Sequence, residues 1–204
     1  MSDISRNEVE LEGLVSEAPV FSHENHETRF YRFSLQIPRL SGQWDTLPIL
    51  IPETLTDQVI PGQPLRLTGQ LRSFNNRSQQ GRRLIISVHV QTLLPPTGEP
   101  RNTIRLTGRL CKPPILRRTP LGRSICDLML AVPRRYGRTD YLPVIVWGRL
   151  AMDTAMLPVS TPVGLEGRIQ SREYTKVTAE GSCQRTAYEV SVMQLLDNDE
   201  DDCE

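Results

Sequence analysis

Residues 139–156, TDYLPVIVWGRLAMDTAM, contain one predicted strand followed by one short predicted helix. From Tyr141 to Trp147 nearly every residue is apolar or favours β-structure, which is typical of a strand covered on both faces. Gly148 ends this strand, and Arg149–Met156 is long enough for about two helical turns. The stretch therefore predicts a strand followed directly by a helix in a small β-rich domain.

The two faces of this strand differ in character. Side chains alternate across a strand, so Leu142, Val144 and Val146 share one face, while Tyr141 and Trp147 lie on the other. One apolar face is enough for a hydrophobic core, so the second face does not need two large rings. Exposed rings on a central strand form a surface on which flat, unpaired bases stack. The strand therefore predicts a stacking platform.

The chain contains an internal repeat. Residues 7–20, NEVELEGLVSEAPV, align with residues 102–115, NTIRLTGRLCKPPI, at a spacing of 95 positions. After a small insertion, LRLTGQLRS ending at Ser73 matches VGLEGRIQS ending at Ser171. The repeat predicts two domains of ordinary size. The expected boundaries are copy 1 at 1–94, a linker at 95–101, copy 2 at 102–196 and a disordered acidic tail at 197–204.

The sequence of each copy predicts five strands and one helix. In copy 2, the first strand is expected to end at Gly108, and the fourth to contain Gly167, because a glycine permits the sharp coil that curls a strand around a small barrel. A polar loop is expected over 173–184. The expected strands of copy 2 begin near residues 102, 124, 139, 162 and 187. This is the layout of an OB-fold, so the predicted class is all-β, with two tandem five-stranded OB-fold barrels and a short helix between strands 3 and 4 of each.

Charge is distributed unevenly along the chain. Residues 101–196 carry 15 Lys and Arg against 7 Asp and Glu, whereas the last eight residues carry six acids and no base. Only Lys112 and Lys176 are lysines. Arginine chelates phosphate and stacks on rings, so this excess favours a nucleic-acid partner. The alternative is a solvated surface whose arginines reflect genome composition.

Several classes of function are not favoured. The sequence has no membrane-spanning apolar run and no secretory leader, so a cytoplasmic location is expected. The four cysteines show no metal-ligand spacing, and His23 and His26 lie in a polar stretch without a third ligand. No P-loop, nucleophile elbow or HExxH occurs. We therefore expect no enzyme activity, no metal and no cofactor.

Copy 2 resembles a known family. The segments LTGRL, LAV, DYLPVIVWGRLA and EGRIQSREY occur in the order and spacing of the bacterial single-stranded DNA-binding protein family. The resemblance implies a role on single-stranded DNA in replication, recombination or repair, in association with the bacterial nucleoid. It implies that bases stack at four aromatic positions, all filled here: Tyr136, Tyr141, Trp147 and Tyr174.

Basic residues beside these rings are the candidate phosphate ligands. They lie on the expected loops and strands next to the platform, where cations would meet the nucleic-acid backbone. The candidates are Arg134, Arg135, Arg138, Arg168, Arg172 and Lys176.

Copy 1 departs from the aromatic pattern. The counterparts of the four rings are Ser41, Thr46, Pro52 and Asn76. We expect copy 1 to be a structural and dimerising partner with weaker DNA contacts. Those contacts are expected at Trp44 in a loop, and at Arg72, Phe74 and Arg77. The alternative is that the rings of copy 1 have moved, with Trp44 replacing one of them.

The expected partners follow from the same resemblance. Family members with one copy assemble as tetramers, so a two-copy chain is expected to form a homodimer with four OB-folds. A first strand with an open edge, Glu8–Gly13, could extend a sheet, with Glu8, Glu10 and Glu12 turned outward. The alternative is that the two copies satisfy each other within one chain and leave a monomer.

The acidic tail carries a weaker expectation, and two other functions stay open. The tail ends DNDEDDCE without the apolar tip that partner enzymes grip in the family, so recruitment of replication or repair proteins through it is less strongly expected. The tail could compete with DNA for basic residues. Cys111, Pro114, Gly122 and the segment PVIV at Pro143 also give a weaker similarity to primosomal replication protein N. A primosomal role acting through partner proteins therefore stays open, as does a role as an RNA-binding OB module.

Overall fold

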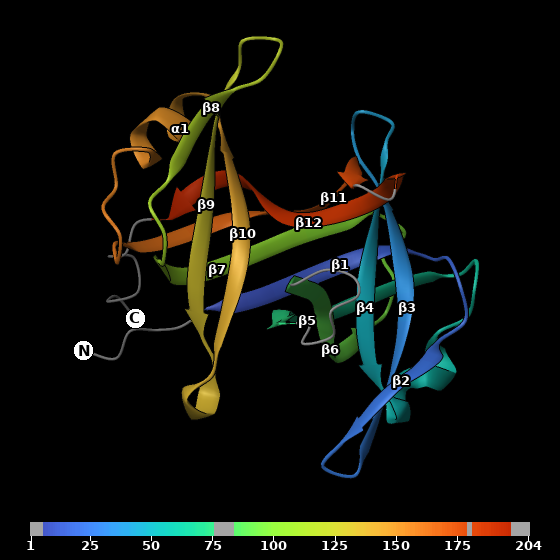
Figure 1. The fold of residues 1–204 in the computed structure, drawn as a ribbon. Helices are drawn as coiled ribbons and strands as arrows, with labels where there is room; N and C mark the ends of the chain where they lie inside the picture. The colour runs from blue at the N-terminus through green and yellow to red at the C-terminus, as the bar shows by residue number, and fades with distance from the viewer. Residues whose placement is uncertain (1–5, 76–83, 179–180, 197–204) are drawn as a thin grey trace.

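The chain forms two β-barrels joined by a continuous sheet (Figure 1). This computed structural model describes residues 6–75, 84–178 and 181–196. The prediction of an all-β chain with two tandem OB-folds is confirmed. No helix among these residues is long and apolar enough to cross a membrane.

The two copies contain the same series of strands with a short helix before the last two, and copy 2 has an additional 3-10 turn, η2. The first has β1 (Asn7–Val15), β2 (Val20–Asn25), β3 (Thr28–Pro38), β4 (Trp44–Pro52), the 3-10 helix η1 (Glu53–Gln58), β5 (Pro64–Asn75) and β6 (Leu84–Leu94). The second has β7 (Arg101–Leu110), β8 (Ile115–Arg118), β9 (Ser124–Pro133), the 3-10 turn η2 (Arg135–Gly137), β10 (Thr139–Trp147), α1 (Gly148–Thr154), β11 (Pro162–Thr178) and β12 (Gly181–Leu196).

Each barrel closes through its first strand. In copy 1, β1 pairs with β5 on one side and with β3 on the other, where Val15 lies opposite Leu35. In copy 2, β7 pairs in the same way with β11 and β9. The third and fifth strands of each copy run parallel, β4 with β6 and β10 with β12. These pairings give both copies the five-stranded closed barrel of the OB-fold.

The cores of the two barrels are built from matched leucines. Alternating strand positions turn an apolar side chain inward, and their burial is the main favourable contribution to folding. Four leucines of copy 1 and their repeat counterparts in copy 2 are fully buried: Leu11 and Leu106, Leu35 and Leu130, Leu47 and Leu142, Leu67 and Leu165. The repeat therefore preserves the core.

Two glycines allow strands to approach closely. A Cβ at Gly108 would lie 2.8 Å from the carbonyl oxygen of Ala131, and one at Gly167 would lie 2.3 Å from that of Ser191. Both distances are shorter than a Cβ tolerates. β7 nevertheless continues past Gly108 to Leu110, so this glycine marks a coil within the strand and not its end.

The structure corrects three expected details. Residues 173–178 and 181–184, expected as a loop, belong to the long β11–β12 hairpin. β2 and β8 are additional strands that pair with β3 and β9. The helix of copy 1 is the 3-10 helix η1, whereas that of copy 2 is α-helical. Short strands and the distal part of a polar hairpin carry little apolar periodicity, so pattern alone did not identify them.

The two barrels join edge to edge. β1 pairs with β7 in antiparallel register from Asn7 opposite Leu106 to Glu12 opposite Arg101. The edge expected to recruit a second chain is therefore occupied within the same chain. Glu12 also does not point into solvent: it is 2% exposed, and its carboxylate accepts hydrogen bonds from Thr97 N, Thr97 Oγ1 and Gly98 N, each 2.7 Å long. This carboxylate fixes the segment between β6 and β7 against β1.

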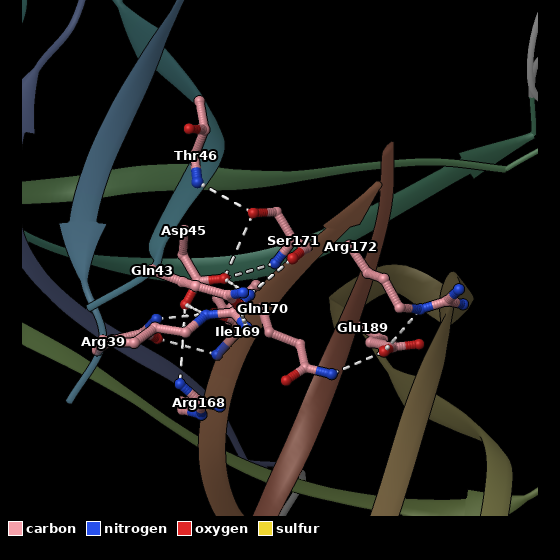
Figure 2. A network of polar contacts seen from close by, with 11 residues as sticks. Arg39, Gln43, Asp45, Thr46, Arg168, Ile169, Gln170, Ser171, Arg172 and Glu189 are labelled. Carbon is pink, nitrogen blue, oxygen red and sulfur yellow. Dashed lines mark hydrogen bonds and ion pairs between the residues drawn. The ribbon is translucent and has the colours of Figure 1, made fainter. Parts of the chain in front are cut away.

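A buried polar cluster in copy 1 binds copy 2. Arg39 forms a bidentate pair with Asp45, which is 1% exposed, and Arg39 Nη2 donates to Ser171 O at 2.7 Å (Figure 2). Asp45 Oδ1 accepts from Ser171 N at 2.7 Å, and Ser171 Oγ accepts from Thr46 N at 3.1 Å. We call Arg39, Asp45, Thr46 and Ser171 the Asp45 cluster.

Copy 2 binds copy 1 through the equivalent residues. Arg134 forms a bidentate pair with Asp140, which is fully buried, and donates to Ser73 O at 2.8 Å. Asp140 Oδ1 accepts from Ser73 N at 2.6 Å, and Ser73 Oγ accepts from Tyr141 N at 2.7 Å. We call Arg134, Asp140, Tyr141 and Ser73 the Asp140 cluster. The two clusters join the barrels reciprocally.

Candidate nucleic-acid interface

The outer face of β10 carries two exposed rings. Tyr141 is 45% exposed and Trp147 is 38% exposed, while Leu142, Val144 and Val146 point into the barrel core. The predicted division of this strand into a core face and an aromatic face is therefore seen in the structure.

Hydrogen bonds to neighbouring strands hold the Trp147 ring and the backbone of Tyr141. The indole Nε1 of Trp147 donates to Ser191 Oγ on β12 at 3.0 Å. The backbone N–H of Tyr141 donates to Ser73 Oγ of copy 1, so the other copy positions this residue. A ring whose position is fixed before binding loses less conformational entropy when a base stacks on it.

The other two predicted rings lie away from this strand. Tyr136 is 98% exposed in η2, between β9 and β10, and adopts a left-handed conformation with φ of 64°. Such a conformation is rare outside glycine and is maintained by the surrounding turn. Tyr174 lies within β11, opposite Arg185 of β12, and not after the fourth strand as expected. Figure 1 shows this hairpin extending beyond β10 toward the start of β4, where Ser171 of β11 bonds Asp45.

Two predicted phosphate ligands have no acidic partner among the described residues, and a third, Arg172, lies near one. Arg135 and Arg138 flank Tyr136, are exposed, and form no ion pair with the acidic residues that the structure describes. Arg172 is 54% exposed at its side chain; its guanidinium lies 5.8 Å from the Tyr174 ring centre and 3.6 Å from Glu189. These three arginines lie beside two of the predicted rings.

Other predicted contacts have a structural role in the joint between the copies. Arg134 and Arg72 both bind the buried carboxylate of Asp140, which therefore competes with a phosphate for both guanidinium groups. Arg168 lies 3.9 Å from Asp45 and is one-third exposed. For Arg134, the repetition of the arginine–aspartate pair as Arg39 and Asp45 was an available signal for this role. Arg72 and Arg168 have glutamines at their repeat positions, Gln170 and Gln70, so the repeat gave no such signal for them.

Phe74, another predicted DNA contact, is 39% exposed and has two close neighbours. One face of its ring lies against the Arg134 guanidinium at 5.1 Å, and the ring stacks on His89 at 5.4 Å. Both neighbours compete with a base for the ring. Burial, with a smaller contribution from Arg72 and Arg134, lowers the pKa of His89 to about 4, and its Nε2 has no hydrogen-bond partner among the described residues.

Two further predicted residues lie on strands. Trp44 is the first residue of β4, not part of a loop, and is half exposed. Lys176 lies in β11, but its side chain is outside the described part of the structure, as are Arg77 and the acidic tail. No group of three His, Cys, Asp or Glu among the described residues is placed to hold a metal ion.

The fold defines this chain as a tandem OB-fold protein with an aromatic, arginine-flanked face on its second barrel. Its overall structure is similar to the wild-type single-stranded DNA-binding protein from Thermus aquaticus, with a TM-score of 0.72 over 94% of this chain and 92% of that one, at 22% identity. This similarity concerns the fold.

Sequence comparison defines the family. The model of the single-strand binding protein family matches residues 101–196. The single-stranded DNA-binding protein of Clostridium tetani is 40% identical over 80 residues, which are 36% of this chain and 55% of that protein. Single-stranded DNA-binding protein B of Bacillus subtilis is 36% identical over 80 residues, 71% of its length. The chain belongs to the single-strand binding protein family, and it spans about half the length of the first curated relatives it matches.

Proposed function

We propose that this protein binds single-stranded DNA without sequence preference, mainly through copy 2, and protects it in replication, recombination or repair. The observation that carries the proposal is the pair of exposed rings, Tyr141 and Trp147, on the outer face of β10. Tyr136 and Tyr174 extend the stacking surface, and Arg135, Arg138 and Arg172 bind phosphates beside them. Base–aromatic stacking tolerates any sequence because every base has a π-face. Neither a primosomal role nor RNA binding has comparable support.

Tryptophan fluorescence tests this proposal. Trp44→Phe leaves Trp147 as the single tryptophan, so quenching reports on copy 2 alone. We expect oligo-dT to quench this signal, and oligo-rU of equal length to bind more weakly. Absence of quenching and of binding by oligo-dT would contradict the proposal, and stronger binding of oligo-rU would redirect it to RNA.

Salt and tail truncation test the electrostatic part. Binding should weaken with salt by about 0.7 log units per log unit of salt for each phosphate neutralised. Removing residues 197–204 should tighten binding at low salt, because the tail competes for the same arginines. Unchanged low-salt affinity would show that the tail does not compete.

We further propose that two chains associate as a homodimer with four OB-folds. Because β1 and β7 occupy each other's edges, this contact must use a different surface. Light scattering at micromolar concentration tests it, and a mass near one chain that does not rise with concentration would refute the dimer.

A further inference from the structure

Copy 1 carries aromatic residues on the face that corresponds to the platform of copy 2. In copy 2, cross-strand pairing aligns Arg117, Ile125 and Trp147 in one row across β8, β9 and β10. Directly paired residues of antiparallel strands project from the same face, so this row lies on the platform side. The large ring of the row comes from β10, its third strand.

The equivalent row of copy 1 has its rings on different strands. His23, Phe30 and Pro52 align across β2, β3 and β4 in the same way. Pro52 occupies the position of Trp147, while the neighbouring strands supply the aromatic rings. The row of copy 1 therefore also contains aromatic rings, but they lie on β3 and β2, one and two strands away from the position that corresponds to Trp147.

The two rings of copy 1 form a flat stack. His23 and Phe30 have ring centres 5.2 Å apart and planes inclined by 16°. His23 is exposed and Phe30 half-buried. A parallel pair with an exposed outer ring offers a surface of the shape that a base requires.

A free cation lies beside this stack. Arg32 is two residues from Phe30 on β3, so its side chain projects from the same face. It is exposed and forms no ion pair with a described acidic residue, whereas Arg29, on the opposite face, is bound to Glu53 at 2.8 Å. The combination of stacked rings and an unpaired guanidinium matches the chemistry of a nucleotide, which has a flat base and an anionic phosphate.

We infer that His23 and Phe30, with Arg32, form a second stacking site for single-stranded DNA on copy 1. The inference rests on the proposed function of copy 2 and identifies where the same strand continues. Figure 1 places β2 and β8, the outer strands of the two rows, at opposite ends of the molecule. A short oligonucleotide therefore occupies one site, whereas a long one reaches both.

The test compares oligonucleotides of two lengths. One OB-fold covers about 4–16 nucleotides, so oligo-dT of about 10 nucleotides fits one copy and about 40 exceeds both. His23→Ala and Phe30→Ala should each weaken binding of the long oligonucleotide about fivefold or more, the effect of losing one stack. Both should leave binding of the short one within twofold, because copy 2 takes it.

Phe21→Ala is the matched control. Phe21 lies on the same hairpin, is 48% exposed, and packs on Tyr31 at the opposite face. It should change neither affinity. His23 is exposed, so His23→Ala keeps the test valid if the half-buried Phe30 proves necessary for folding. Ultraviolet cross-linking of the long oligonucleotide should also label the peptide containing residues 20–32.

The outcomes separate the two proposals. Suppose that the wild-type chain binds both oligonucleotides, but that His23→Ala and Phe30→Ala have the same affinities as Phe21→Ala. The second site is then refuted, and the proposed function of copy 2 stands. If the wild-type chain binds neither, the proposed function fails and the second site with it.

Discussion

The Asp45 and Asp140 clusters share one bonding pattern but hold different residues. Both contain an arginine, a buried aspartate and a serine from the other copy. In the first, the serine hydroxyl holds the backbone of Thr46, and in the second it holds that of Tyr141. The joint between the copies has been kept on both sides, while the exposed residue beside it has changed. Burial thus limits the choice of residue at the joint more strongly than exposure does at the surface beside it.

The largest difference between the clusters should appear when the aspartates are removed. Asp140 contacts both Arg72 and Arg134 within hydrogen-bonding distance, whereas Arg39 is the single arginine among the described residues that is hydrogen-bonded to Asp45. Asp140→Ala should lower the free energy of unfolding by about 3–5 kcal/mol, since it leaves two guanidinium groups uncompensated. Asp45→Ala should cost about 1 kcal/mol less. Urea denaturation measures both, and a larger loss at Asp45 would reverse the comparison.

His89 should make the Asp140 side sensitive to pH. Its pKa is lowered to about 4 from the ordinary 6.5, so the unfolded chain takes up a proton first as the pH falls. Stability is therefore complete above pH 6.5 and declines between 6.5 and about 4, by about 2–3 kcal/mol. His89→Gln should flatten urea-measured stability across this range. The equivalent position near Asp45 is Ser191, and Ser191→Ala should leave the pH dependence intact.

The two tryptophans test the difference between the copies on DNA. Trp147→Ala should weaken oligo-dT binding by about 1–3 kcal/mol, the contribution of one stacked base. Trp44→Ala should cost clearly less, because Trp44 lacks a partner ring on its strand in the described structure. Isothermal titration at one salt concentration compares them. Equal losses would contradict the specialisation of copy 2.

The smallest expected effect is that of removing the two serine hydroxyls, and it distinguishes a residue that only stabilises the joint from one that also positions Tyr141. Ser73→Ala removes the 2.7 Å hydrogen bond from Tyr141 N, and Ser171→Ala removes the 3.1 Å bond from Thr46 N together with a longer one, 3.4 Å, to Asp45 Oδ1. Each variant should destabilise the chain by about 1 kcal/mol. Ser73→Ala should in addition weaken oligo-dT binding by about two- to threefold, because it releases the Tyr141 backbone. Equal DNA affinities in the two variants would show that Ser73 has no positioning role.

Much of the fold could be predicted from the sequence. Alternating apolar residues and their repetition located the five barrel strands of each copy, because a barrel core imposes a strict period of two. The exposed rings of β10 followed from the same alternation. The distal β11–β12 hairpin did not, since its residues bury little apolar surface and its pairing depends on backbone bonds.

The roles of the arginines could not be predicted in the same way. Arg134 and Arg135 are adjacent in sequence, yet one is bound to a buried aspartate and the other is exposed. Arg134 pairs with Asp140, six residues further on, and both bond to Ser73 of the other copy, a contact that spans 61 residues from Arg134. Similarly, the row of His23, Phe30 and Pro52 depends on strand register, including a bulge in β2 that shifts His23 opposite Phe30.

The β1–β7 ladder changes how this protein responds to dilution. Two separate OB-folds joined by the same strand pairing would dissociate as their concentration falls. Here the strands belong to one chain, and the short connection between Leu94 and Arg101 keeps them at an effective concentration of about millimolar. Pairing along this edge is therefore independent of the amount of protein in the cell. Neither copy can exchange with a copy from another molecule at this edge without first breaking the ladder, so each chain keeps one aromatic-platform barrel joined to one divergent barrel.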